Sequence, residues 1–270
     1  MRFQLLWHEV SVEVDDDAAR AAVGRMVQHA GHPFAPEARA VLTVERGDAG
    51  YVVSDNGDEL ARVGSAEAVL DVVFTRAYRR ALELASLKGW LRVHGAVVAP
   101  GGRRMAVVGP AGAGKSTLTV DMLRRGQAIE GDESFLVRDG SVLTVPRRLH
   151  VKPGTVALLP DAAWLRDAPL LDPLAVRAVD PTDHGHPWAL GTEPVSAMVA
   201  LRRTDGPSAI EPLSAGEAAR ELIEQAFPLT ESRAAIVREA AAVAAAAPAF
   251  VLSAGPDLRA AELLGAPVCP

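Results

Sequence analysis

The stretch Gly109-Pro110-Ala111-Gly112-Ala113-Gly114-Lys115-Ser116-Thr117 matches the phosphate-loop pattern G-x-x-x-x-G-K-[ST]. Glycines let successive backbone N–H groups turn toward one anion, and the start of the following helix adds partial positive charge. Lys115 is placed to reach the β- and γ-phosphates, and the Ser116 hydroxyl is placed to ligate Mg²⁺. The sequence therefore predicts a nucleoside triphosphate site with these cofactor-binding residues: Gly109, Ala111, Gly112, Ala113, Gly114, Lys115, Ser116 and Thr117.

The sequence on both sides of this loop has the strand–loop–helix order that the motif requires. Residues 104–108 are mostly apolar and predict a buried strand, and residues 117–125 predict a helix that ends at Gly126. A glycine- and alanine-rich turn without a ligand is the alternative. The agreement of both flanks with the motif disfavours that alternative.

The composition limits the classes of function to consider. Of the 270 residues, 49% are hydrophobic, which is enough for a sizeable core. A net charge of −6 argues against a general nucleic-acid binder and against a protein of anionic membrane surfaces. Cys269 has no partner for an internal disulfide, and the sequence has neither a signal-peptide pattern nor an apolar run of membrane-spanning length. We expect a cytoplasmic protein without nucleic-acid or membrane partners.

The first part of the chain, residues 1–88, predicts a small α+β region in which we find no catalytic constellation. The expected strands are 5–14, 40–45, 50–54 and 59–63, and the expected helices are 18–29 and about 66–88. Ser65 is the expected cap of the second helix. Its expected apolar face consists of Val69, Leu70, Val73, Ala77, Leu84 and Leu87.

A histidine is expected at the mouth of the phosphate loop. Residues 91–98 predict a strand, and Gly101-Gly102 predicts a two-residue turn into the strand before the loop. In a tight hairpin the numbers of paired residues then add to 203, so that His94 lies opposite Gly109. An imidazole there is suited to meet phosphate or to relay a proton, while the plainer interpretation is a satisfied, partly buried histidine.

Two acidic residues follow the next predicted strand. Asp132 and Glu133 end the segment 126–133, and Asp132 lies only 17 residues after Lys115. A carboxylate at a strand end beside a phosphate loop can hold Mg²⁺ or accept a proton from an attacking hydroxyl. Asp132 is therefore a candidate base, and Ser116, Asp132 and Glu133 are candidate metal ligands.

A basic run comes next, after a predicted hairpin of strands 134–138 and 142–145. Arg147, Arg148, His150 and Lys152 place four cationic or potentially cationic side chains within six positions. Such a run suits a site at which phosphate charge is neutralised, although a solvated basic loop is the alternative. The pairs His29/His32 and His184/His186 lack a third spaced ligand, so we interpret them as loop histidines.

The remainder of the chain predicts secondary structure but no further motif. Residues 155–190 are rich in loops and could form a lid or a substrate-binding flap. The expected strands are 195–202, 209–213 and 249–252, and the expected helices are 214–226, 229–247 and one from 257 onward. The stretch 213–217 (LSAGE) imitates the signature of transporter ATPases, but Ser214 fits a helix cap better.

Four features of the sequence together carry a resemblance to a known family. They are Val93-His94-Gly95, the phosphate loop, Arg125-Gly126 and Asp132-Glu133. In this order they resemble the catalytic domain of HPr serine kinases and their HPr-kinase-like relatives. The resemblance covers roughly residues 90–255 and is most specific between 93 and 152. It implies an α/β fold with α+β character, in which residues 89–270 form a kinase domain with a mixed sheet like that of phosphoenolpyruvate carboxykinases. Residues 1–88 precede it as the small α+β region.

The resemblance also implies an activity: transfer of the γ-phosphoryl group of ATP, with Mg²⁺, to a serine hydroxyl. Asp132 stands at the family's catalytic base, with His94 nearby and Lys115 on the phosphates. Glu133 replaces the second aspartate of the family pair. Arg147 and Arg148 are candidates to neutralise charge in the transition state, without a firm motif equivalence. The family's long motif for removing serine phosphate is not apparent.

Three functions stay open at this stage. The first is a kinase whose partner is a peptide or protein carrying the acceptor hydroxyl, for instance a modified-peptide precursor. The second is a kinase of a small hydroxylated metabolite. The third is a non-catalytic nucleotide-binding regulatory module, which the joint presence of His94, Lys115 and Asp132 disfavours. HPr kinases are hexamers, so the resemblance also raises a homo-oligomer as an expectation.

Overall fold

We analysed a computed structural model of the chain, which describes all residues except 28–33, 146, 172–174, 186–190 and 267–270. The chain divides into two compact units, Met1–Lys88 and Gly89–Pro270, and each is described by itself. Within the described residues, every helix is too short or too polar to span a bilayer.

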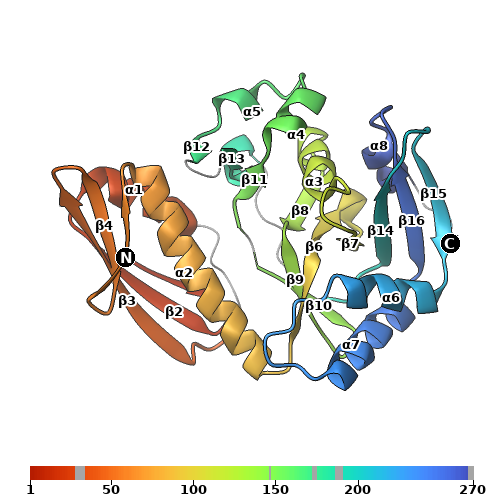
Figure 1. The fold of residues 1–270 in the computed structure, drawn as a ribbon, viewed down its shortest axis with the longest axis horizontal. Helices are drawn as coiled ribbons and strands as arrows, with labels where there is room; N and C mark the ends of the chain where they lie inside the picture. The colour runs from red at the N-terminus through yellow and green to blue at the C-terminus, as the bar shows by residue number, and fades with distance from the viewer. Residues whose placement is uncertain (28–33, 146, 172–174, 186–190, 267–270) are drawn as a thin grey trace. The chain divides into compact units, whose positions relative to one another are not determined.

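The first unit is a five-stranded sheet with two helices. Its elements are β1 (Arg2–Leu5), β2 (His8–Val14), α1 (Asp17–Val27), β3 (Ala38–Gly47), β4 (Gly50–Asp55), β5 (Asp58–Val63) and α2 (Ala66–Leu87). The strands follow one another in chain order, and only the β2–β3 pair is parallel. The helices pack against each other, and α2 lies along the sheet (Figure 1).

Two expectations for this unit were wrong. The strand expected over 5–14 is broken at Leu6, whose φ of 52° lies in the left-handed region, so β1 and β2 form an antiparallel pair. Leu87 was expected on the apolar face of α2 but is 74% exposed at the last turn. The Ser65 cap is confirmed, because its side chain accepts a hydrogen bond from the backbone N–H of Ala68 at 3.2 Å.

The second unit holds a larger mixed sheet and a small three-stranded one. Its strands are β6 (Leu91–Ala99), β7 (Met105–Val108), β8 (Ala128–Gly131), β9 (Ser134–Arg138), β10 (Ser141–Thr144), β11 (Leu149–Val151), β12 (Leu170–Leu171), β13 (Val176–Val179), β14 (Ala197–Arg203), β15 (Ala209–Leu213) and β16 (Ala249–Ala254). Its helices are α3 (Lys115–Arg124), α4 (Pro153–Leu158), α5 (Trp164–Asp167), α6 (Ala215–Glu224), α7 (Arg233–Ala246) and α8 (Ala260–Gly265), with the short 3-10 helices η1 (Pro100–Gly102) and η2 (Pro181–His184).

The large sheet has the order β10-β9-β6-β7-β14-β16-β15, and β8 also pairs with β6. Within it, β7, β14 and β16 are neighbouring parallel strands, while β6 and β15 run antiparallel to their neighbours. Helices cover both faces. One apolar core joins the sheet to α3 and α8, and another joins it to α6 and α7. The three parallel strands therefore end at a common edge, where the segments that follow them meet (Figure 1).

The predicted hairpin register is confirmed. Gly95 pairs with Val108, and Gly101 and Gly102 both have positive φ in the turn, with the N–H of Arg103 donating to the Pro100 carbonyl at 3.1 Å. Asp132 directly follows β8, as expected for a residue at a strand end.

Several predicted boundaries in this unit were wrong. Helix α3 begins at Lys115, because left-handed Gly114 is its N-terminal cap residue. Helix α7 begins at Arg233, after the cap Ser232, and α8 begins at Ala260 rather than near 257. Asp257 instead accepts hydrogen bonds from Ser208, which holds the preceding turn. The segment 155–190, expected to be rich in loops, contains most of α4 and all of α5, β12, β13 and η2 among its described residues, joined by short turns and irregular stretches.

Candidate functional site

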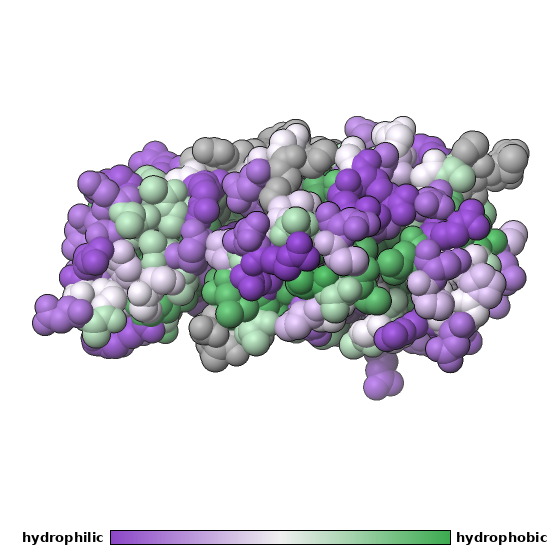
Figure 2. All heavy atoms as spheres, turned by 90° about the horizontal axis from the view of Figure 1, so that it is seen from above, coloured by the Kyte–Doolittle hydropathy of each residue, from purple (hydrophilic) through white to green (hydrophobic). Residues whose placement is uncertain are grey.

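A pocket of about 920 Å³ opens at the carboxyl edge of the parallel strands. Figure 2 looks onto this edge and shows apolar side chains between hydrophilic ones. The lining combines the phosphate loop, the end of β8, the basic run and the start of α4. Its residues from the sequence predictions are His94, Ala111, Gly112, Gly114, Lys115, Ser116, Thr117, Asp132, Glu133, Arg147, Arg148, His150 and Lys152. The predicted catalytic residues thus share one cavity.

Glycine is required at the first position of the phosphate loop. Gly109 has a φ of 155°, and a Cβ atom there would lie 2.4 Å from the carbonyl oxygen of Leu201 on the neighbouring strand β14. Gly112 and Gly114 also have positive φ, with values of 84° and 102°. These conformations, open to glycine and strained for other residues, let the loop turn tightly into the N-terminus of α3.

Lys115 is buried at the base of the pocket. Its ammonium donates to the carbonyl oxygens of Gly109 at 2.6 Å and Pro110 at 3.2 Å. Burial lowers the pKa of Lys115, and the charge of Asp132 opposes that shift. The ammonium is therefore held against the loop, where a bound phosphate would restore a full counter-charge.

Asp132 is the buried carboxylate of the pocket. Ser116 lies beside its side chain and favours the charged carboxylate, so the first turn of α3 and the end of β8 meet there. Burial raises the pKa of Asp132 above the ordinary aspartate value, against the opposing effect of the neighbouring Ser116 side chain. A carboxylate with a raised pKa is a stronger base than an exposed aspartate, which suits proton abstraction.

The chain is strained beside this carboxylate. Glu133 has a φ of 80°, in the left-handed region that non-glycine residues seldom adopt. This conformation directs its carbonyl to the backbone N–H of Gly95 at 3.2 Å. Gly95 in turn has no room for a side chain, since a Cβ atom would lie 2.5 Å from the Val107 carbonyl oxygen and 2.6 Å from the Phe135 ring.

The Glu133 carbonyl fixes the tautomer of His94. Its Nδ1 lies 2.7 Å from the Glu133 carbonyl oxygen, and because a carbonyl only accepts, Nδ1 carries the hydrogen. Burial, followed by the positive charge of Lys115, lowers the pKa of His94 below 6.5. The neutral ring therefore keeps its lone pair on Nε2, and Phe227 packs edge-on against it at 5.9 Å between centroids.

The predicted basic run reaches the pocket. Arg147 forms an ion pair with Glu133 and donates to His150 Nδ1 at 2.9 Å. Five lysine or arginine side chains line the pocket against two carboxylates, although the whole chain carries a net charge of −6. The pocket is thus locally cationic in an acidic protein, which favours an anionic ligand.

The donor atoms of the pocket suit Mg²⁺ better than a metal that takes several side-chain ligands. Among the described residues, no group of three or more His, Cys, Asp or Glu side chains could hold a metal ion. Mg²⁺ commonly takes only one or two carboxylates and completes its shell with water and phosphate oxygens. The adjacent oxygens of Ser116 and Asp132 fit that pattern. Glu133 is engaged by Arg147. His29, His32 and His186 lie outside the described residues.

Sequence reasoning missed Arg203 and Thr155. Arg203 ends β14 and lines the pocket, and Thr155 in α4 hydrogen-bonds Thr117 between hydroxyl oxygens at 2.8 Å. Arg202 and Arg203 come at the end of an apolar run that predicts a core strand. In the structure this strand pairs in parallel with β7, the strand before the phosphate loop. Pairing the two strands in the sequence analysis would have placed Arg203 beside the loop.

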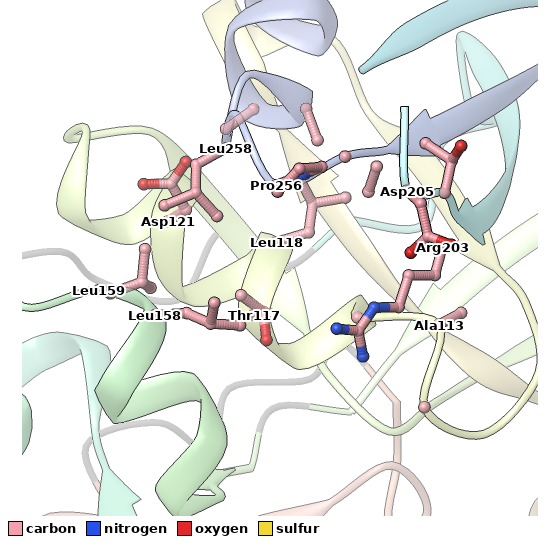
Figure 3. A pocket seen from close by; sticks show the side chains of 17 residues that line it. Ala113, Thr117, Leu118, Asp121, Leu158, Leu159, Arg203, Asp205, Pro256 and Leu258 are labelled. Carbon is pink, nitrogen blue, oxygen red and sulfur yellow. The ribbon is translucent and has the colours of Figure 1, made fainter. Parts of the chain in front are cut away.

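A second, smaller pocket of about 280 Å³ adjoins the phosphate loop. It is lined mainly by aliphatic side chains from α3, from the end of α4 and from the turn between β16 and α8 (Figure 3). Ala113, which does not line the larger pocket, lines this one, whereas Gly109 lines neither. Both pockets share Gly112, Gly114, Thr117, Leu158 and Arg203.

Comparison with solved structures gives distant likenesses. No family model matches the sequence, and no curated protein matches it. Among solved structures, the chain is similar to the HPr(Ser) kinase/phosphatase from Coxiella burnetii, with 13% sequence identity and a TM-score of 0.29. The match covers 56% of this chain and 87% of that one. At this level we base the proposed function on the residues of the site.

Proposed function

We propose that this chain is an ATP- and Mg²⁺-dependent kinase of the HPr-kinase-like type, which transfers the γ-phosphoryl group to a serine hydroxyl of a peptide or protein. The observation that carries the proposal is the pairing of the buried Asp132 carboxylate with Ser116, in a cavity that also holds Lys115. A protein that only bound nucleotide would have no need of a buried base at the reacting end of the phosphates.

The phosphate loop supplies the binding part of the mechanism. Backbone N–H groups of residues 111–117 and the N-terminus of α3 would receive the β- and γ-phosphates, and Lys115 would add a positive charge. When bound, Mg²⁺ would be held by Ser116 with Asp132 beside it and would neutralise phosphate charge. Phosphoryl transfer needs mainly such positioning and charge stabilisation.

Asp132 is the residue we assign as base. The acceptor O–H gives its proton to the Asp132 carboxylate, the acceptor oxygen bonds to the γ-phosphorus, and the bond to the β-phosphate bridging oxygen breaks, so that ADP leaves. The neutral His94 presents Nε2 as a hydrogen-bond acceptor and is suited to orient the acceptor hydroxyl.

Arg147 and Arg148 are the cations that we assign to the charge of the transferring group. Both line the cavity, and Arg147 forms an ion pair with Glu133. Bound phosphate would compete with Glu133 for the Arg147 guanidinium, and bidentate pairing of arginine with phosphate is strong. A cavity of about 920 Å³, at the upper end of the range for small-molecule sites, supports a peptide segment as acceptor rather than a small metabolite.

The experiment uses purified protein, Mg²⁺, γ-labelled ATP and a peptide and protein pool from the source cell. The Lys115→Met and Asp132→Asn variants are run in parallel, and the label is located by mass spectrometry. We expect label on a serine of one peptide or protein with the wild type and not with either variant. Label found only in small molecules would mean that the acceptor is a metabolite and not a peptide or protein. Nucleotide binding without any transfer would contradict the kinase assignment.

A further inference from the structure

We infer that the smaller pocket of about 280 Å³ receives the nucleoside of the bound nucleotide, with the base held between aliphatic side chains. The inference rests on the proposed function, which places the phosphates on the loop between the two pockets. It adds the part of the nucleotide site that the phosphate-loop motif leaves undefined.

Continuity with the phosphate loop is the first support. Gly112, Gly114 and Thr117 line both pockets, so a ligand on this loop has the acidic residues on one side and the aliphatic pocket on the other. Asp132 and Glu133 line only the larger pocket, which places the γ-phosphate end there. The nucleoside end of the same molecule must then leave the loop on the opposite side.

The walls of the pocket are the second support. The space is surrounded by Leu118 of α3, by Leu158 and Leu159 at the end of α4, and by Pro256 and Leu258 of the β16–α8 turn (Figure 3). Flat bases gain from burial between such apolar surfaces, and none of the described residues that line this pocket is aromatic. The pocket also lies at the ends of the parallel strands β7, β14 and β16, where α/β sheets bind nucleotides.

The polar groups of the pocket fit a nucleoside and the start of its phosphate chain. Asp121 is already engaged, because both its oxygens accept hydrogen bonds from Arg124 and Arg125. Asp205, an exposed carboxylate at the rim, is suited to accept hydrogen bonds from ribose hydroxyls or base N–H groups. Arg203 lines both pockets, and its guanidinium turns toward Thr117 (Figure 3). That position suits the phosphate nearest the ribose.

The test compares two ligands that share the phosphates but not the nucleoside. Affinities for Mg·ATP and for Mg·tripolyphosphate are measured by calorimetry on the whole chain. We expect the wild type to bind ATP at least about tenfold more tightly, as burial of one base in an apolar site allows. Lys115→Met should weaken both ligands.

Two variants change the aliphatic pocket in opposite ways. Ala254→Phe fills it, and Leu258→Gly removes a wall at a residue whose φ of 54° a glycine adopts freely. Ala245→Phe, on an exposed position of α7, is the matched control. Both pocket variants should bind ATP about tenfold more weakly and keep tripolyphosphate within about twofold of wild type.

The outcomes separate the inference from the proposal on which it rests. Equal affinity of the wild type for ATP and tripolyphosphate, or pocket variants with unchanged preference for ATP, would overturn the nucleoside pocket and leave the phosphate loop as a phosphate site. Binding of neither ligand by the wild type would overturn both. Thermal unfolding of each variant shows whether it is folded. If Ala254→Phe does not fold, the ATP and tripolyphosphate affinities of Leu258→Gly decide between these outcomes.

Discussion

The two pockets on either side of the phosphate loop differ in what lines them. The larger contains lysines, arginines, histidines and two carboxylates, and the smaller is walled by leucines, alanines and a proline. They share one loop and one arginine, Arg203. The contrast teaches that one backbone motif can separate two tasks. Its polar side is suited to move a proton and neutralise charge, while its apolar side is suited mainly to bury an apolar group.

The two pockets also differ in how their titratable groups are held, although a left-handed non-glycine residue lies beside each, Glu133 at the larger and Leu258 at the smaller. Near the larger pocket, Glu133 is held at positive φ, and its carbonyl fixes the ring of His94. Asp132 and Lys115, buried there, have pKa values shifted in opposite directions by the same desolvation. Such shifted pKa values, together with the strain at Glu133, are typical of reacting sites.

The Asp132→Asn variant should show the largest effect and sharpen the comparison most. Loss of the base should lower phosphoryl transfer by about 10²–10⁴-fold. Asp132 must be deprotonated to act as a base, and burial raises its pKa. The transfer rate of the wild type should therefore rise with pH through a midpoint above 3.8, and this rise should be absent in the variant. Steady-state rates across pH measure this, with the exposed Asp161→Asn as control. An unchanged pH profile would remove Asp132 from the mechanism.

Lys115→Met is expected to come next, with transfer reduced by about 10²–10³-fold, because one buried donor to the transferring phosphates is lost. Unlike Asp132→Asn, it should also weaken nucleotide binding, which titration of Mg·ATP measures. If Lys115→Met bound ATP as tightly as the wild type, the loop would not be the phosphate site.

His94→Gln should have a smaller effect, about tenfold on transfer, as for a group that orients rather than reacts. It should also change how stability depends on pH. The folded-state pKa of His94 lies below 6.5, so the unfolded chain binds more protons in the window beneath 6.5. The wild type should therefore lose stability, relative to the variant, as the pH falls through that window. Parallel urea-unfolding curves for the two proteins would contradict the buried neutral histidine.

Ser214→Ala should have the smallest effect and should leave both pockets unchanged. Ser214 and Glu217 form a capping box at the start of α6, with the Glu217 N–H donating to Ser214 Oγ at 3.3 Å. Its loss should cost about 1 kcal/mol of unfolding free energy. Urea unfolding measures this, and a change in ATP affinity would show that the site depends on α6 more than the contacts indicate.

Much of the polar side could be predicted from local sequence. The Gly101-Gly102 turn set the register that places His94 near the loop, because a tight turn leaves few ways to pair the strands. Asp132 was predicted at a strand end, and the basic run was predicted as a phosphate-neutralising cluster; both lie in the pocket. These features depend on neighbours within about 40 residues of the loop, a range that short β-hairpins and turns connect.

The apolar side could not be predicted in this way. It is assembled from the phosphate loop, α3, the end of α4 and the turn after β16, so its walls come from residues 112–261 and depend on β14 and β16 lying next to β7. Isolated leucines and alanines carry no motif that distinguishes a ligand pocket from core. The left-handed conformations of Leu6 and Glu133 were missed for a related reason, because tertiary contacts hold them against their local preference.

A crystal structure of the chain with Mg²⁺ and a non-hydrolysable ATP analogue tests the central claim most directly. The account predicts phosphates on the N–H groups of the phosphate loop, the γ-phosphate between Lys115 and Asp132, and the base between Leu118, Leu158 and Leu258. A nucleotide bound elsewhere, or phosphates on the loop with the base turned away from the aliphatic pocket, would contradict the division of tasks between the two pockets.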